Sequence, residues 1–274
     1  MTSMKKFKTW AYIIAMLAIL SSALGTASAA TAPTLGSASS FAVLAGSIVT
    51  NTGATIITGD LGISPSIGVP PHYTGFPPGV VTGTIHDADV SAAAAQADNI
   101  AAFAFIDQGC DTTYAGVQDL AGFNLVSGVY CADAFELSGT LTLSGSGVWI
   151  FKSASALITS GTANVVGGDQ CSVWWRVVSS ATLGTNTALT GNILALTSIG
   201  LNTGASLNGR ALAQTGAVTM DTNVVNPSDC SGPPPSSIPE FGNSMIAIAL
   251  GAAGLLGFQL MRRTTKKSLN ATAS

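Results

Sequence analysis

The chain has 274 residues, of which 47% are hydrophobic and only 8% charged, and its formal net charge is −3. Between residues 30 and 237, three basic residues (Lys152, Arg176 and Arg210) stand against twelve acidic ones, a net charge near −9. A domain with so few Lys and Arg side chains cannot neutralise phosphates, which excludes nucleic-acid binding.

The first 29 residues are typical of a secretory signal peptide. Lys5, Lys6 and Lys8 form a basic region, residues 11–20 are uncharged and apolar, and residues 27–29 (ASA) offer a cleavage point. The apolar stretch is short for a spanning helix, which needs about 20 residues. We therefore predict a signal peptide over residues 1–29 and a single exported domain over residues 30–230.

Short segments rich in Val, Ile, Leu and Thr alternate with Gly, Asn and Ser through most of this domain, which indicates β-structure. The proline-rich stretch at residues 65–78 (PSIGVPPHYTGFPP) cannot continue a sheet and is predicted to cap one end of the β-rich body.

One stretch, residues 87–108, is alanine-rich and predicts a helix, with Asp87 as N-cap and Gly109 as stop. A stripe of mostly small residues at helical spacing is expected to pack closely on a flat surface. The stripe consists of Val90, Ala93, Ala94, Ala97, Ile100, Ala101 and Ala104.

Four cysteines, Cys110, Cys131, Cys171 and Cys230, lie in the exported part, where an even number favours disulfides over metal. No Cys-x-x-Cys occurs, and His72 and His86 are far from any cysteine, so we predict no metal and no other cofactor. Of the three possible pairings we favour Cys110–Cys131, which clips the helix end to the next strand, and Cys171–Cys230, which ties down the domain's C-terminus.

The second half of the domain contains a repeat. Residues 188–203 (ALTGNILALTSIGLNT) run directly into residues 204–222 (GASLNGRALAQTGAVTMDT), and residues 163–187 end in the same way. Each copy divides into three short strands without a helix, which predicts one turn of a three-sided β-solenoid.

Two sides of the solenoid are distinguished by pattern. One contains residues 148–151, 173–175, 193–196 and 211–213, which are apolar on both strand faces and must be covered, with the alanine stripe as the cover. A second side alternates: Leu141, Leu157, Leu183, Ile199 and Val218 are predicted to point inward, and Thr140, Thr142, Thr182, Ser198 and Thr219 outward.

The turns that follow repeat a pattern of Thr, a small residue, any residue and then a hydroxyl. It occurs from Thr52 to Thr55, from Thr187 to Thr190 and from Thr203 to Ser206, and more loosely from Thr162 to Asn164. Because the turns adjoin the alternating side, we count these end residues and the outward ones above as one candidate surface.

At the C-terminal end, residues 231–240 form a Pro/Ser-rich spacer and residues 241–267 a membrane segment. Residues 245–261 carry no charge, and Arg262, Arg263, Lys266 and Lys267 follow, which places the domain outside the cell and anchors it to the membrane or cell surface. The motif Pro-Glu-Phe-Gly at residues 239–242, with the apolar run and the basic tail, resembles archaeal C-terminal sorting signals. This resemblance implies a surface-sorting membrane enzyme as a partner and leaves open whether the helix is removed.

Six segments of the domain together resemble the microbial ice-binding protein family, over residues 34 to 226. They are SSFAVLAG (39–46), GDLGISP (59–65), VTGTIH (81–86), SSATLGT (179–185), ILALTSI (193–199) and LNGRALA (207–213). The resemblance implies a mainly β fold, an irregular three-sided right-handed β-solenoid with one long helix alongside. It also implies that a flat face with Thr-Ala/Gly-x-Thr/Asn repeats binds an ice crystal surface.

The spacing of a solenoid gives this function a physical basis. Stacked rungs lie about 4.8 Å apart and alternate residues of a strand about 6.7 Å apart, close to repeats of water oxygens in ice. Threonine hydroxyls can hold water in such a grid while their methyl groups exclude disordered water. Charged groups would order water differently, and they are rare here.

Solenoid enzymes that cleave acidic polysaccharides need clustered carboxylates with a basic residue, whereas the carboxylates here are scattered singly, so we predict no enzyme. A surface adhesin or envelope protein that binds glycan or itself fits export, anchoring and a rigid acidic body equally well, and it stays open as the alternative.

Overall fold

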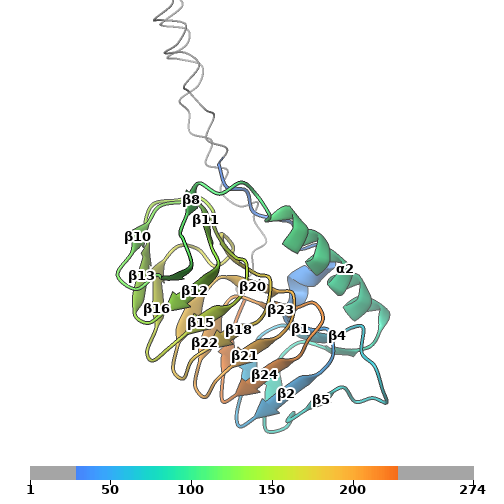
Figure 1. Ribbon diagram of the computed structural model, residues 1–274. Coiled ribbons are helices and arrows are strands. Elements are labelled where there is room, and N and C mark those ends of the chain that lie inside the picture. The colour runs from blue at the N-terminus through green and yellow to red at the C-terminus, as the bar shows by residue number, and fades with distance from the viewer. Residues whose placement is uncertain (1–28, 228–274) are drawn as a thin grey trace, which may run out of the picture. The chain divides into compact units, whose positions relative to one another are not determined.

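The chain forms a β-solenoid with three parallel sheets and one long helix (Figure 1). The computed structural model describes residues 29–227, all within one compact unit. The predicted spacer and C-terminal membrane segment lie outside these residues. So does the predicted signal peptide, except for Ala29. Within residues 29–227 no helix is long and apolar enough to cross a membrane.

Sheet A forms the side that the helix covers. In spatial order it has nine strands: β7 (Ile85–Asp87), β4 (Asp60–Ile63), β1 (Phe41–Ala45), β23 (Ala211–Ala213), β20 (Asn192–Ala195), β17 (Val173–Val177), β14 (Trp149–Ser153), β11 (Gly128–Ala132) and β8 (Thr112–Thr113).

Sheets B and C form the other two sides, with eight strands each. Sheet B has the order β5 (Tyr73–Thr74), β2 (Val49–Thr52), β24 (Val218–Asp221), β21 (Ile199–Leu201), β18 (Ala181–Leu183), β15 (Leu157–Thr159), β12 (Ala134–Leu137) and β9 (Val117–Asp119). Sheet C has the order β10 (Asn124–Leu125), β13 (Thr140–Leu143), β16 (Asn164–Gly167), β19 (Ala188–Thr190), β22 (Ser206–Asn208), β25 (Val224–Val225), β3 (Ile56–Ile57) and β6 (Val80–Val81).

The strand orders show that the chain does not wind from one end of the solenoid to the other. The first strand, β1, lies between other strands in the interior of the solenoid, and the chain winds from there to one end at β7. Helix α2 (Val90–Phe105) then leads the chain to the opposite end. From β8 the chain winds back until β23, β24 and β25 pair in parallel with β1, β2 and β3. The predicted repeats are confirmed, because β19–β21 and β22–β24 are successive turns.

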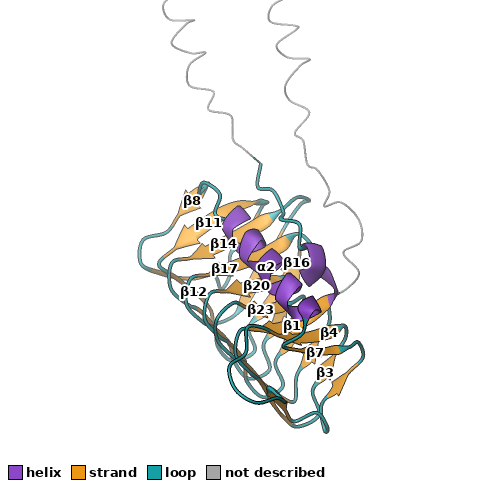
Figure 2. Ribbon diagram, turned by 90° about the vertical axis from the view of Figure 1, so that its right-hand side faces the viewer, coloured by secondary structure: helices purple, strands orange, loops and turns teal. Residues whose placement is uncertain are grey.

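Sheet A is apolar on both faces, as predicted. Its inward side chains include Phe151 and Trp175, whose rings stack with centroids 4.2 Å apart. Its outward side chains, among them Ile150, Trp174 and Leu194, pack in a second cluster with the helix and the short 3-10 helix η1 (Gly36–Ser40). Figure 2 shows α2 lying across the strands of sheet A.

The helix packs on the face opposite to the predicted one. Val90 is 85% and Ile100 51% exposed, and every other residue of the predicted stripe (Ala93, Ala94, Ala97, Ala101 and Ala104) is also exposed. The buried residues are Ala92, Ala95, Gln96, Asn99, Ala102 and Phe103. Gln96 belongs to this buried face, where its Nε2 donates to the backbone carbonyls of Ser64 (2.8 Å) and Ala213 (3.0 Å).

The helix also starts later than predicted. Its N-cap is Asp89, whose carboxylate accepts from the Ala92 N–H at 2.8 Å, whereas Asp87 accepts from the backbone N–H of His72 at 3.0 Å. The proline-rich stretch lies at the end of the solenoid, as predicted, but it does add strand β5, which pairs with β2.

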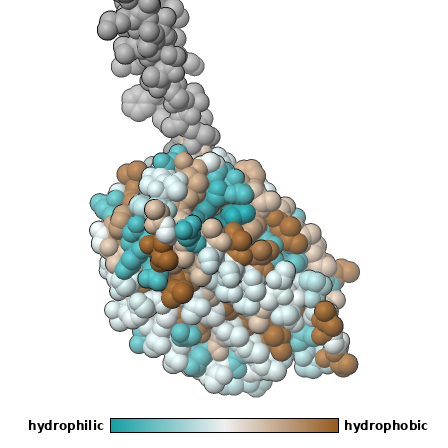
Figure 3. Space-filling model, viewed as in Figure 1, coloured by the Kyte–Doolittle hydropathy of each residue, from teal (hydrophilic) through white to brown (hydrophobic). Residues whose placement is uncertain are grey.

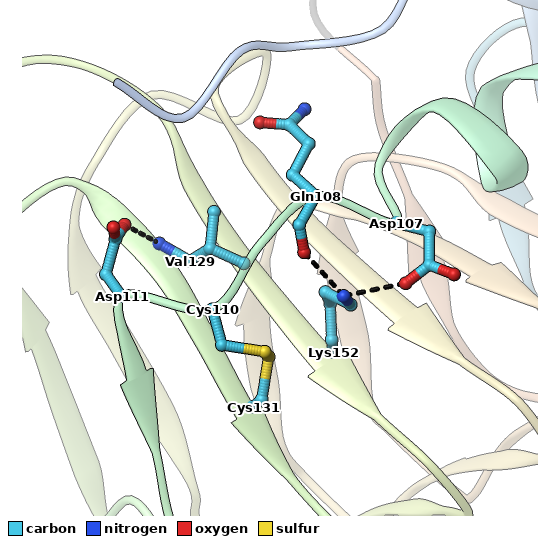
Figure 4. The surroundings of a disulfide bond; sticks show 7 residues. All are labelled: Asp107, Gln108, Cys110, Asp111, Val129, Cys131 and Lys152. Carbon is cyan, nitrogen blue, oxygen red and sulfur yellow. Dashed lines mark hydrogen bonds and ion pairs between the residues drawn. A yellow bond between two sulfur atoms is a disulfide. The ribbon is translucent and has the colours of Figure 1, made fainter. Parts of the chain in front are cut away.

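A disulfide joins Cys110 and Cys131, as predicted, and ties the segment after the helix to β11 (Figure 4). Beside it, Lys152 of β14 donates to the Gln108 carbonyl at 2.6 Å and pairs with Asp107, also at 2.6 Å. The second predicted disulfide includes Cys230, which lies outside the described residues.

Candidate functional site

Sheet B, which the helix does not cover (Figure 1), presents an outer surface built from alternating residues. Inward residues such as Val49, Val218 and Ile199 are fully buried. The outward residues of neighbouring strands pair in register, so that they form one rank along the sheet. This rank reads Thr74, Thr50, Thr219, Gly200, Thr182, Ile158 and Glu136.

The threonine hydroxyls of this rank are not used by the fold. Within the described residues, the hydroxyls of Thr50, Thr182 and Thr219 have no hydrogen-bond partner. Each can therefore bind water, while the methyl group next to it faces solvent. Gly200 leaves a gap between Thr219 and Thr182, and Ile158 adds an apolar side chain that is 45% exposed.

The turns between sheets B and C stack in register and form a second hydroxyl-bearing rank, which we call the B–C corner. Asn186, Gly204, Thr222 and Gly53 have positive φ angles of 60°, 74°, 55° and 78°. Backbone N–H groups of three of them donate to the next turn, Asn186 to Thr203 O (3.1 Å), Gly204 to Asp221 O (3.1 Å) and Thr222 to Thr52 O (2.9 Å). Because each turn bends at the same place, the preceding residues Thr185, Thr203, Asp221 and Thr52 follow one another on successive rungs, and the three threonines are exposed. The hydroxyl of Thr203 donates to the Asp221 carboxylate.

The structure divides the predicted surface residues among four places. Sheet B and its edge carry Thr182, Ser198 and Thr219; the B–C corner carries Thr52, Thr162 and Thr203; sheet C carries Thr140, Thr142, Asn164, Thr190 and Ser206; and the interior contains Thr55 and Thr187.

Thr55 and Thr187 cannot contact a ligand, because both are 0% exposed. The hydroxyl of Thr187 bonds that of Thr159 at 2.7 Å, and that of Thr55 accepts from the Asn223 N–H at 3.0 Å. The predicted turn pattern from Thr187 to Thr190 therefore starts two residues too late. The turn equivalent to Thr203-Gly204 is Thr185-Asn186, since Asn186 bonds across to Thr203.

We had predicted that Thr140, Thr142 and Leu141 lie on the side that carries Thr182 and Thr219. This prediction is wrong, because all three residues belong to sheet C. Sheets B and C both alternate with one buried face, so the period of two is the same in each. The residues that the sequence analysis missed are Thr50, Thr74, Thr185 and Thr222. Aligning the turns on their left-handed Gly and Asn residues would have found the last two.

Positive charge is absent from the outer surface of sheet B. Lys152 and Arg176 both pair with Asp107 beside the helix, and Arg210 donates to the Ser39 carbonyl at 2.7 Å. The acidic residues on the strands of sheet B are Asp221, next to the corner, and Glu136 and Asp119 towards β9. In Figure 3 the surface over β18, β21, β24 and β2 is mostly pale, the shade of residues with intermediate hydropathy such as Thr, Ser and Gly.

The carboxylates and histidines do not assemble a catalytic or metal site. His72 bonds Asp87 and His86 bonds Asp89, each through Nδ1 at 2.7 Å, near the start of the helix. Among residues 29–227 no group of three or more His, Cys, Asp or Glu side chains is placed to hold a metal ion.

Comparison with known proteins identifies the family. The family model described as Ice-binding-like matches residues 43–226. The chain belongs to this family. It is 41% identical over 268 residues to an ice-binding protein of Nostoc sp. (strain HG1), which covers 94% of this chain and 97% of that protein.

Solved structures of family members share the fold. The crystal structure of an ice-binding protein from the Antarctic ascomycete Antarctomyces psychrotrophicus matches with a TM-score of 0.67 and 41% identity, covering 72% of this chain and 98% of that one. A structure of an ice-binding protein from an Arctic yeast matches with a TM-score of 0.63 and 28% identity, over 71% of this chain and 94% of that one. A mainly β solenoid with three sheets and one helix is therefore the fold of this family.

Proposed function

We propose that this member of the Ice-binding-like family binds ice through sheet B and the B–C corner. One observation carries the proposal: in-register threonine hydroxyls without protein partners lie on a surface that has no Lys or Arg. Rungs about 4.8 Å apart place these hydroxyls at intervals close to those of ice. The proposal assigns no catalysis to the chain.

We further propose that the protein is exported and held at the cell surface. Support comes from the basic and apolar N-terminal segment and from the apolar run at residues 245–261 with its basic tail. The similarity to the Nostoc protein covers 94% of the chain and so extends beyond the solenoid. Display at the surface would hold cells to ice or shape ice close to them.

Ice binding is tested on residues 30–236. This range includes the compact unit without the signal peptide, and the Antarctomyces structure consists almost entirely of the matching domain. A single ice crystal is observed by cryomicroscopy, and the gap between melting and growth temperatures is recorded. Faceted crystals and an open gap are expected for the unmodified domain.

The face is tested by bulky substitutions. Thr219→Tyr and Thr182→Tyr place a ring above the flat rank and should close most of the gap. Ala97→Tyr adds the same bulk on the exposed face of the helix, away from sheet B, and should leave the gap open. Crystals that grow as smooth discs with the unmodified domain would refute ice binding and turn attention to glycans or self-association.

A further inference from the structure

Sheet C carries two parallel ranks that differ in chemistry. The polar rank has an uncharged hydrogen-bonding residue on five successive rungs: Thr190, Asn208, Asn226, Thr58 and Thr82. The neighbouring rank is mostly aliphatic on the same rungs: Ala188, Ser206, Val224, Ile56 and Val80.

The aliphatic rank leaves large side chains in solvent. Val224 is 46%, Ile56 47% and Val80 53% exposed, and they pair in register on three adjacent strands. β-branched side chains in register present a row of methyl groups at the rung spacing of about 4.8 Å. Such a row excludes disordered water in the same way as threonine methyl groups do.

The polar rank, about 6.7 Å away along each strand, is free to bind water. Within the described residues the hydroxyls of Thr190 and Thr58 have no protein partner, whereas that of Thr82 accepts from the Gly59 N–H at 3.1 Å. No outward residue on the described strands of sheet C is charged. Sheet B, in contrast, carries Glu136 in its rank and Asp221 at the corner.

The size of sheet C argues against a protein partner. Eight rungs at about 4.8 Å, each with about 10 Å of strand, offer roughly 350 Å², against about 800 Å² per partner in a stable interface. Its outward strand residues include no aromatic side chain that would stack on a sugar ring. A flat, uncharged surface with water-binding and water-excluding ranks at ice-like spacings fits ice itself.

We propose that sheet C is a second ice-binding surface, which contacts a crystal plane different from the one that sheet B contacts. This inference rests on the proposed function. Sheets B and C are adjoining sides of a three-sided solenoid (Figure 1), so one flat crystal plane cannot touch both at once. The protein therefore binds in two orientations.

The test uses residues 30–236 labelled with a fluorophore at the α-amino group and frozen onto a single-crystal ice hemisphere. Two sets of labelled planes are expected for the unmodified domain. Asn208→Tyr and Thr58→Tyr, on sheet C, should each reduce labelling of one set at least tenfold and leave the other. Thr219→Tyr, on sheet B, should do the reverse, and Ala97→Tyr should change neither, with circular dichroism confirming that all variants fold.

The outcomes separate the two proposals. If the unmodified domain labels one set only and Thr219→Tyr removes it, or if Thr219→Tyr removes both sets, sheet C is not an ice-binding surface while sheet B remains one. If the unmodified domain labels nothing, both proposals fail. A dimer in sedimentation equilibrium that Asn208→Tyr converts to a monomer would overturn the inference in favour of self-association through sheet C.

Discussion

At the scale of single residues, burial separates threonines with the same local sequence into two kinds. Thr185 and Thr187 lie two positions apart in one turn, yet the first is exposed and the second is 0% exposed. The hydroxyl of Thr187 bonds Thr159, which also accepts from the Gly184 N–H at 2.8 Å. The inner Thr187 therefore helps to hold the B–C corner together, whereas the hydroxyl of Thr185 has no partner among the described residues and can contact water.

This division predicts opposite effects of two substitutions. Thr187→Val keeps the shape but removes the bond to Thr159, so it should lower the free energy of unfolding by about 1–2 kcal/mol. Thr185→Tyr is on the exposed rank and should change stability by less than about 0.5 kcal/mol. Denaturant unfolding measures both, and the gap between melting and growth temperatures should shrink for Thr185→Tyr alone. Loss of that gap in folded Thr187→Val would contradict the assignment.

At the scale of elements, the sequence predicted the strands and their stacking better than it predicted the face on which each residue lies. Strands apolar on both sides identified sheet A, and the three-strand repeat identified the solenoid. Sheets B and C share one period, and the intervals between equivalent residues vary: 24 from Asn164 to Ala188 but 18 from Ala188 to Ser206. Pattern alone therefore cannot assign a threonine to one of the two sheets.

The helix illustrates a different limit. Its two faces are both rich in alanine, and the predicted face is the one with Val90 and Ile100. Sheet A, however, packs the large side chains of Ile150 and Trp174 against the helix, and the carbonyls of Ser64 and Ala213 accept hydrogen bonds from it. Small helix residues leave room for these side chains, and Gln96 supplies the hydrogen-bond donor. The helix sequence alone does not show either requirement, because both come from the structure that the helix packs against.

Both ends of the helix are held by carboxylates, which makes its docking sensitive to acid. The hydrogen bond from Lys152, followed by the charge of Arg176, holds the pKa of Asp107 below its usual value. The backbone N–H of Ala92 lowers the pKa of the N-cap Asp89. Because the folded-state pKa values lie below the unfolded ones, this stabilisation is complete above about pH 4 and is lost as the pH falls further.

The denaturant midpoint should therefore fall as the pH drops below about 4, where these carboxylates become protonated. Asp107→Asn should start with a lower midpoint at pH 7 and lose less of it on acidification, since one of the titrating groups is gone. Denaturant unfolding at a series of pH values measures this. Parallel curves for the variant and the unmodified domain would show that Asp107 does not contribute.

At the scale of the whole molecule, the route of the chain changes how a solenoid should unfold. In most repeat proteins each turn contacts only its neighbours, so the ends open independently. Here the turns before the helix and those after it come from separate parts of the chain and meet at β1 and β23. Arg210 of the later part also donates to the Ser39 carbonyl of the earlier part, at 2.7 Å.

The helix adds a second connection between the two ends. Near its middle, Gln96 donates to the carbonyls of Ser64 and Ala213, and near its end Arg176 donates to the Phe103 carbonyl at 3.1 Å. We therefore expect one cooperative unfolding transition, with the slowest amide hydrogen exchange at β1 and β23 and faster exchange at the terminal strands β7 and β8. Two separate transitions, or fastest exchange at the β1–β23 junction, would show that the two parts fold independently.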